Sequence, residues 1–134
     1  MEKERRRRRR VVVPRPDRVR RIEEVAFGWL DARLFREGWL EVLSPEDVAV
    51  YVFLCLAADR QGISWWRRDR VGRVLGLDDR QVRQALGRLY DFDLLAYRPF
   101  GPHASDGFHQ VLSVRPGGPP RPEIPMDILG RGNR

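Results

Sequence analysis

The sequence of 134 residues contains a single cysteine, Cys55, and no apolar run of membrane-spanning length. One thiol excludes an internal disulfide, which fits a reducing compartment and leads us to expect a cytoplasmic protein. The apolar run around that cysteine, VYVFLCLAA (residues 50–58), is much shorter than the roughly 20 residues of a transmembrane helix. The N-terminal arginines lead only into three valines before Pro14, which is not the pattern of a secretion signal. We therefore expect no membrane partner.

The sequence also lacks the residue combinations that catalysis requires, namely a phosphate-binding loop, a set of metal ligands, or a nucleophile with a nearby base. Cys55 has apolar neighbours and no histidine close in sequence, so we interpret it as a core residue. His103 and His109 flank Asp106, but without a cysteine and on a turn-rich segment they make a weak metal site. We expect no enzyme activity, no metal, no cofactor and no small-molecule effector.

Lysine is nearly absent, because 25 of the 26 basic residues are arginine. The net charge of +7 is unevenly distributed: residues 1–21 carry +8, residues 22–59 carry −6, residues 60–88 carry +5, and residues 89–134 are neutral. A compositional bias explains the choice of arginine over lysine, but it does not explain this segregation. Two basic segments separated by an acidic one predict attraction of a polyanion to particular parts of the chain.

Residues 67–91 contain two consecutive helical patterns. Asp78 followed by Gln81 is the Asp-x-x-Gln form of a capping box and predicts the start of the second helix. Gly76 is suited to end the first helix, and Gly72 is small enough to let the two helices approach closely. The positions at helical spacing that we expect to be buried are Val71, Val74 and Leu75 in the first helix and Val82, Ala85, Leu86 and Leu89 in the second.

The stretch RRDRVGRVLGLDDRQVRQALGRLYDFDLLAY (residues 67–97) resembles the winged helix-turn-helix domains of bacterial DNA-binding proteins. The similarity lies in the Leu75-Gly76-Leu77 turn, in the apolar positions of the second helix, and in the Leu94-Leu95 pair that leads into the wing. Asp93 stands where many members carry glycine, and aspartate tolerates a left-handed backbone better than most residues. The resemblance covers roughly residues 44–114. It implies a mainly α fold with a small β-hairpin wing.

The flanking segments complete the expected organisation of a single domain with tails. Six consecutive arginines with Pro14 and Pro16 predict a disordered basic arm over residues 1–18. Apolar residues at helical spacing predict an additional N-terminal amphipathic helix over residues 19–43, interrupted near Gly38. The many prolines and glycines of residues 115–134 predict a flexible tail.

Within residues 44–114, Ser44-Pro45-Glu46-Asp47 is a strong helix start. The helix that it begins, extending to about Arg60, is apolar nearly all round and should be buried on every side, with the N-terminal helix as one cover. Residues 63–66 form a short extended segment. Residues 94–98 and 108–114 form the wing hairpin, with its tip at residues 101–107.

In the geometry that the resemblance implies, the second helix enters the DNA major groove. Arg80, Arg83 and Gln84 are the candidates for contacts with base edges, while Arg88 is expected to meet phosphate. The full set of candidate DNA-binding residues is Arg67, Arg68, Arg70, Arg73, Arg80, Gln81, Arg83, Gln84 and Arg88. The alternative is a solvated helix face with charge pairs such as Asp79 with Arg83.

Two further groups complete the candidate interface. The wing contributes His103, Ser105 and His109 to contacts with the DNA backbone or minor groove. The basic arm, made of Arg5, Arg6, Arg7, Arg8, Arg9 and Arg10, supplies affinity without sequence information. The alternative for the arm is a solvated tail with no specific role.

The sequence therefore predicts a binder of double-stranded DNA, either a small transcription regulator or an accessory protein of replication or mobile elements. A homodimer through the N-terminal helix is compatible with it. The main alternative is a winged-helix protein-interaction module, in which the acidic segment 22–43 is the working surface and the arginine arm a general polyanion tether. A third reading is single-strand binding through Trp65 and Trp66, which stand beside Arg67 and Arg68.

Overall fold

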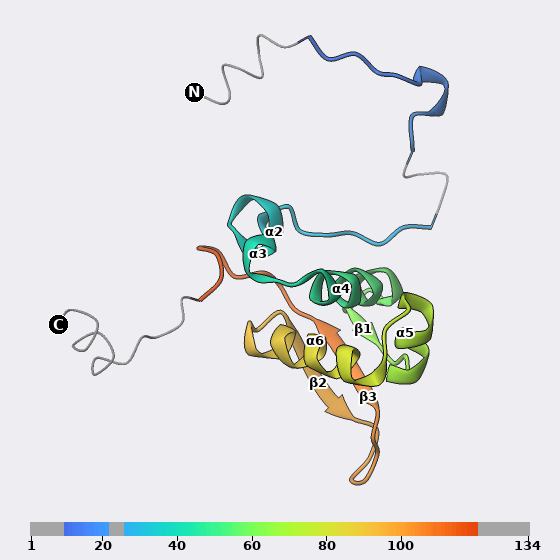
Figure 1. Cartoon of the computed structure of the whole chain (residues 1–134), viewed down its shortest axis with the longest axis vertical. Helices are drawn as coiled ribbons and strands as arrows, with labels where there is room; N and C mark the ends of the chain where they lie inside the picture. Colours follow the sequence, from blue (N-terminus) through green and yellow to red (C-terminus); the bar gives the residue numbers. More distant parts are fainter. Residues whose placement is uncertain (1–9, 22–25, 121–134) are drawn as a thin grey trace, which may run out of the picture.

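The computed structural model describes residues 10–21 and 26–120. This part of the chain is a mixed fold with five α-helices and one three-stranded antiparallel sheet (Figure 1). The elements are a 3-10 turn η1 (Pro16–Arg18), α2 (Arg33–Arg36), α3 (Trp39–Val42), α4 (Pro45–Ala57), β1 (Ile63–Ser64), α5 (Arg68–Leu75), α6 (Asp79–Asp91), β2 (Leu95–Pro99) and β3 (Gly107–Val111). No helix of the described ranges has the length and apolarity that crossing a bilayer requires.

Helix α4 begins where the sequence predicts, at a capping box. The Ser44 hydroxyl accepts a hydrogen bond from the Asp47 amide at 3.1 Å, and the Asp47 carboxylate accepts one from the Ser44 amide at 2.9 Å. Val50 and Leu54 on this helix are almost completely buried. The expectation of burial on every side is wrong for Leu56, which is exposed near the C-terminal end of the helix.

Helices α5 and α6 are present as predicted, and the predicted end of α5 and start of α6 are confirmed. Gly76 ends α5 with φ +71°, and the capping box of Asp78 and Gln81 starts α6. The apolar stripe of α6 is buried as expected, whereas Val74 of α5 is exposed, contrary to the prediction. Gly72 faces α6 so closely that an added Cβ would lie 2.6 Å from the Leu77 carbonyl oxygen.

The sheet consists of the predicted hairpin and one further strand, in the order β1-β3-β2. Both neighbours of β3 pair with it antiparallel, so that His109 lies opposite Tyr97 on one side and Ser64 on the other. Asp93, between α6 and β2, has φ +60° and is the one non-glycine residue of the described chain in the left-handed region. The loop between β2 and β3 projects from the body of the molecule (Figure 1).

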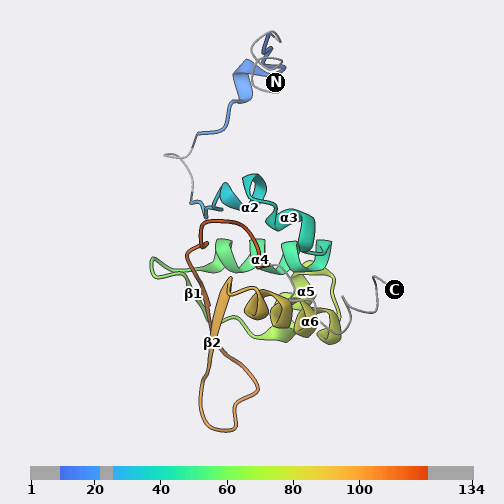
Figure 2. The same ribbon diagram turned by 90° about the vertical axis from the view of Figure 1, so that its left-hand side faces the viewer.

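Of the amphipathic helix predicted for residues 19–43, the described residues 26–31 are not helical, whereas the predicted interruption near Gly38 is confirmed. Residues 26–31 are extended, and α2 and α3 are one-turn helices separated by Gly38 with φ +84°. Packing explains the extended path, because a Cβ on Gly28 would lie 2.9 Å from the Cys55 carbonyl oxygen of α4. The segment nevertheless covers α4 as predicted, because α2 and α3 lie on the side of α4 opposite α6 (Figures 1 and 2).

The predictions for the two ends of the chain fall partly outside the described residues. Of the basic arm, residues 1–9 are outside, and residues 16–18 form the 3-10 turn η1. Of the C-terminal segment, residues 121–134 are outside. The residues before them contact the segment of α2 and α3, which we call the N-terminal cover. The Gly117 amide donates a hydrogen bond of 2.8 Å to the Glu37 carboxylate, and Val114 is buried.

Substitution of Gly72 tests the close approach of α5 to α6, and substitution of Gly87 tests the open face of α6. Because an added methyl group at Gly72 would strike the Leu77 backbone, we expect Gly72→Ala to lower the free energy of unfolding by about 1–3 kcal/mol. Nothing lies within 4 Å of a Cβ on Gly87, so Gly87→Ala should raise it by about 0.5–1 kcal/mol through helix propensity. Chemical denaturation of the two variants measures both values. A destabilised Gly87→Ala variant would contradict the placement of that residue on an open helix face.

Candidate nucleic-acid interface

The outward face of α6 carries three polar side chains with space around them. Arg80, Arg83 and Gln84 are exposed, because the opposite face of the helix supplies the buried apolar stripe. Gln81, which was predicted to belong to this group, is half-buried and its side-chain oxygen accepts a hydrogen bond from the Asp78 amide at 3.0 Å. Its first role is therefore to cap the helix.

Arg83 is paired within its own helix. Its guanidinium lies 2.8 Å from the Asp79 carboxylate, one turn earlier, and both side chains are more than half exposed. A solvent-exposed pair of this kind contributes about 0–1 kcal/mol, so an incoming phosphate or guanine can replace Asp79 at little cost. The charge pair of Asp79 with Arg83, predicted as the alternative, is therefore present, and contact of Arg83 with DNA stays a prediction.

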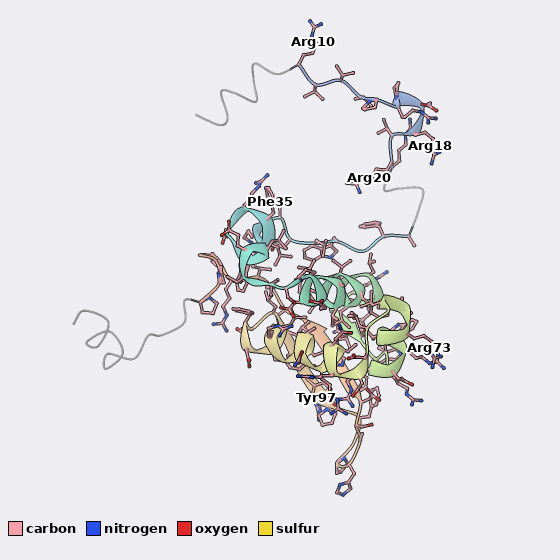
Figure 3. All side chains as sticks on the ribbon, in the orientation of Figure 1. Arg10, Arg18, Arg20, Phe35, Arg73 and Tyr97 are labelled. Carbon is pink, nitrogen blue, oxygen red and sulfur yellow. The ribbon has the colours of Figure 1, made fainter. Side chains whose placement is uncertain are left out.

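The arginines of the first helix divide into two groups. Arg70 and Arg73 are exposed, and Figure 3 shows Arg73 projecting from the outer side of α5. Arg67 lies 3.4 Å from Asp69 and is exposed as well. Arg68 points inward and lies 3.8 Å from Asp106 and 3.9 Å from Asp79. Three of the four are therefore accessible to a ligand, and the fourth belongs to the support of the surface.

Asp106 is a positioning residue that the sequence did not reveal. It lies in the loop before β3, and its carboxylate accepts a hydrogen bond of 3.1 Å from the Arg68 amide at the N-terminal end of α5. The contact spans 38 residues of sequence. It ties the base of the wing to α5, and no local pattern around Asp106 predicts that partner.

The wing and α6 enclose a groove of about 250 Å³. Arg68 and Arg83 line it from the helices, and Tyr97, Ser105 and Asp106 line it from the hairpin. Gly87 forms part of its wall without a side chain. The groove therefore brings together Arg83 and Ser105, which were predicted separately as residues of the helix and of the wing. His103 is exposed in the loop of the hairpin.

His109, predicted as a wing contact, has a different position. It is buried in β3 with its side chain toward α6, and its Nδ1 is 2.7 Å from the Tyr90 hydroxyl. The Tyr90 and His109 rings are stacked, with centroids 6.1 Å apart. Burial lowers the pKa of His109, Asp106 partly opposes this, and the charge of Arg68 lowers it further. The residue is therefore a buried core group, and its ring forms part of the inner wall of the groove.

Arg88, predicted to contact phosphate, is committed to a partner inside the protein. Its Nε and Nη2 lie 2.8 and 2.7 Å from the carboxylate of Asp47, which is fully buried at the start of α4. Nη2 also lies 3.3 Å from the Ser44 hydroxyl. This two-point contact raises the pKa of Arg88 and holds α6 against the N-terminal end of α4. The partners are 41 residues apart in sequence, so the spacing that suggested a surface arginine gave no sign of the pair.

The basic arm contributes one described member to the candidate interface. Arg10 is exposed, as are Arg18 and Arg20 farther along the chain (Figure 3). Arg5, Arg6, Arg7, Arg8 and Arg9 lie outside the described residues. Cys55 is buried in α4, as predicted for a core residue, and burial raises the pKa of its thiol.

The pair of Asp47 and Arg88 is open to a double-mutant test. We expect Arg88→Ala to lower the free energy of unfolding by about 2–4 kcal/mol, because it leaves a buried carboxylate without its cation. The double variant Asp47→Ala/Arg88→Ala should lose less than the sum of the two single changes. Urea denaturation of the four proteins gives the coupling energy. Additive losses would show that the contact does not join the helices.

His109 predicts a dependence of stability on pH. Since its pKa in the folded protein is below its ordinary value of 6.5, the unfolded chain takes up the proton more readily. The free energy of unfolding should therefore be highest above about pH 6.5 and fall toward pH 5, by at most about 1.4 kcal/mol per pH unit. His109→Gln should remove this slope, whereas substitution of the exposed His103 by glutamine should leave it unchanged. Thermal unfolding at a series of pH values distinguishes the two variants.

Among the described residues, no three histidine, cysteine, aspartate or glutamate side chains are placed to share a metal ion. No protein-family model matches the chain, and searches among curated proteins and solved structures also gave no match. The case for a function therefore depends on this chain's own geometry and charge.

Proposed function

We propose that the chain is a winged helix-turn-helix protein that binds double-stranded DNA, with α6 as the recognition helix. The observation that carries the proposal is the arrangement of elements. Helix, strand, two helices and a hairpin follow one another as α4-β1-α5-α6-β2-β3, with sheet order β1-β3-β2. In this arrangement α6 presents Arg80, Arg83 and Gln84 beside a projecting hairpin. An exposed helix of this kind fits the width of the DNA major groove.

We assign the proposed DNA contacts according to whether each side chain is exposed or already bonded to a partner inside the protein. Arg80 and Arg83 are the proposed readers of base edges, because an arginine can grip guanine with two hydrogen bonds. Arg70 and Arg73 on α5, together with Ser105 and His103 of the wing, are the proposed contacts with the sugar-phosphate backbone. Arg88 and His109 are left out of the interface and assigned to its support. The basic arm adds affinity that is independent of sequence.

A second candidate is a protein-interaction module, and one observation favours it. Phe27, Trp29 and Phe35 are exposed around the N-terminal cover, within residues 22–59, which carry a net charge of −6. An apolar surface of this kind is typical of a partner interface. A homodimer through the N-terminal segment stays a prediction, and the surface available for it among residues 26–43 is that of α2, α3 and the chain before them. Regulator and replication or mobile-element accessory remain equal options for a DNA-binding role.

Selection from a random duplex library tests the DNA-binding proposal. The protein to use is the full chain with the six arginines of residues 5–10 replaced by serine, so that the arm does not mask any preference of α6. We expect enrichment of a defined motif, and we expect Arg83→Ala to weaken binding to it by about 1–3 kcal/mol. Arg36→Ala, which removes an exposed arginine from α2, is the matched control and should bind like the parent.

The same measurement separates the two candidates. Arg70→Ala and Arg73→Ala should each weaken binding to all duplexes alike and reduce the salt dependence by about one phosphate contact. Binding without any enriched motif, unchanged in the Arg83→Ala variant, would rule out a reading role for α6. The acidic and apolar N-terminal surface would then be the better candidate for the working surface.

A further inference from the structure

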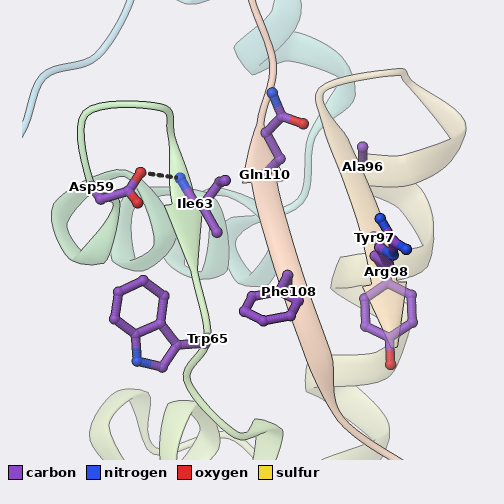
Figure 4. Close-up of a pocket in the computed structure, with 8 residues that line it drawn as sticks. All are labelled: Asp59, Ile63, Trp65, Ala96, Tyr97, Arg98, Phe108 and Gln110. Carbon is purple, nitrogen blue, oxygen red and sulfur yellow. Dashed lines mark hydrogen bonds between the residues drawn. The ribbon is translucent and has the colours of Figure 1, made fainter. Parts of the chain in front are cut away.

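The outer face of the sheet, which is turned away from α6, carries its own group of aromatic and basic side chains. The register places Arg98 opposite Phe108, and Gln110 between Ala96 and Ile63. Their neighbours Leu95 and His109 are buried on the helical side, so these residues point outward. Figure 4 shows Trp65, Phe108 and Arg98 spread across this face.

The aromatic rings of this face are accessible rather than packed into the core. Trp65 is 58% exposed and Phe108 is 42% exposed. Phe108 is held in place by an edge-to-face contact with Phe100, whose ring centroid is 4.9 Å away. In contrast, the neighbouring Trp66 packs edge-on against Phe53, with centroids 5.2 Å apart. Trp66 is 40% exposed but does not line the hollow over the strands, so Trp65 is the indole of this pair that faces it.

A hollow of about 530 Å³ lies over the strands at this place. Trp65, Phe108 and Arg98 line it together with Ile63 and Ala96, which are small enough to leave the space open. Its volume is within the range of sites for planar ligands of the size of one or two nucleobases. A recess of this kind between exposed rings suits flat, aromatic groups.

One basic side chain of this face, Arg98, is available to a phosphate. Arg98 is exposed and lines the hollow, and within the described ranges no acidic side chain forms an ion pair with it. The one carboxylate at the hollow, that of Asp59, accepts hydrogen bonds from the amides of Gln61 and Ile63, both at 2.9 Å. It is thus turned into the tight turn that precedes β1.

We propose that this outer sheet face, defined by Trp65, Phe108 and Arg98, binds single-stranded nucleic acid. Unpaired bases stack on Trp65 and Phe108, and Arg98, on the far side of Phe108 from Trp65, contacts the phosphate next to the base on Phe108. A duplex keeps its bases inside the stack, so the rings distinguish single strands from double strands. The site is separate from α6 and does not depend on the function proposed for that helix.

Fluorescence anisotropy of the full chain tests the proposal. The probe is a labelled oligothymidylate of about twelve nucleotides, which forms no duplex, compared with a duplex of equal length. Salt is raised until contacts of the basic arm are weak, because stacking depends less on salt than phosphate binding does. We expect Trp65→Ala and Phe108→Ala each to weaken binding of the single strand about tenfold or more, with less than about twofold change for the duplex.

Two controls separate this site from the rest of the molecule. Trp29→Ala removes an indole that is 74% exposed but lies outside the sheet, and it should bind the single strand like the parent. The double variant Arg80→Ala/Arg83→Ala should lose duplex binding and keep single-strand binding. Thermal unfolding shows whether each variant remains folded.

Three outcomes would overturn the proposal. The first is single-strand binding by Trp65→Ala and Phe108→Ala that equals that of the parent. The second is an equal loss for single strand and duplex, which would assign the effect to general attraction. The third is unchanged single-strand binding together with a shift from dimer to monomer in sedimentation, which would assign the face to a contact between copies. If the Arg80→Ala/Arg83→Ala variant loses duplex binding but keeps single-strand binding, the result supports a separate site on the sheet.

Discussion

Helix α4 has apolar side chains on most of its circumference, and the elements around it are arranged to keep these side chains from water. The apolar stripe of α6 covers one side, and α5 and the sheet cover adjacent parts. Leu34, Trp39 and Leu43 of the N-terminal cover close the opposite side. Burial of this kind is non-directional, so it explains why the elements gather around α4 but not how each one is oriented. Orientation comes from a few polar contacts with fixed geometry.

Three such contacts link elements that are distant in sequence. The carboxylate of Asp47 fixes α6 through Arg88, Asp106 fixes the wing to α5, and the Tyr90–His109 hydrogen bond fixes the sheet to α6. The first joins two helices, the other two join a helix to the sheet or to its hairpin, and each lies behind or beside the exposed α6 surface. The outward residues Arg80, Arg83 and Gln84 are thus presented on a support that is held at several points. A helix held in this way has little freedom to shift when a ligand binds, which favours binding of one ligand over binding of many.

Local signals in the sequence were sufficient for the central part of the fold. The capping boxes of Ser44 and Asp78, the left-handed Gly76 and the unusual backbone of Asp93 all follow from the residue types at those positions. Predictions from these local patterns were wrong where the partner of a residue lies far away in the sequence. Residues 26–31 have an amphipathic pattern, but the close approach of Gly28 to α4 imposes an extended path. Arg88 and His109 looked like surface residues because Asp47 and Tyr90 are not near them in the chain. Asp106 was missed for the same reason.

The hydrogen bond between Gly117 and Glu37 has a consequence for the order of folding. It joins residues 80 positions apart and closes the N-terminal cover over α4. During synthesis, α4, α5 and α6 can form from contacts between neighbours in sequence, and the hairpin can follow as soon as β3 has emerged. The cover is fastened only after residue 117 is made, because contacts of large sequence separation form late. Until then α2 and α3 stay on α4 through the apolar contacts of Leu34, Trp39 and Leu43 alone.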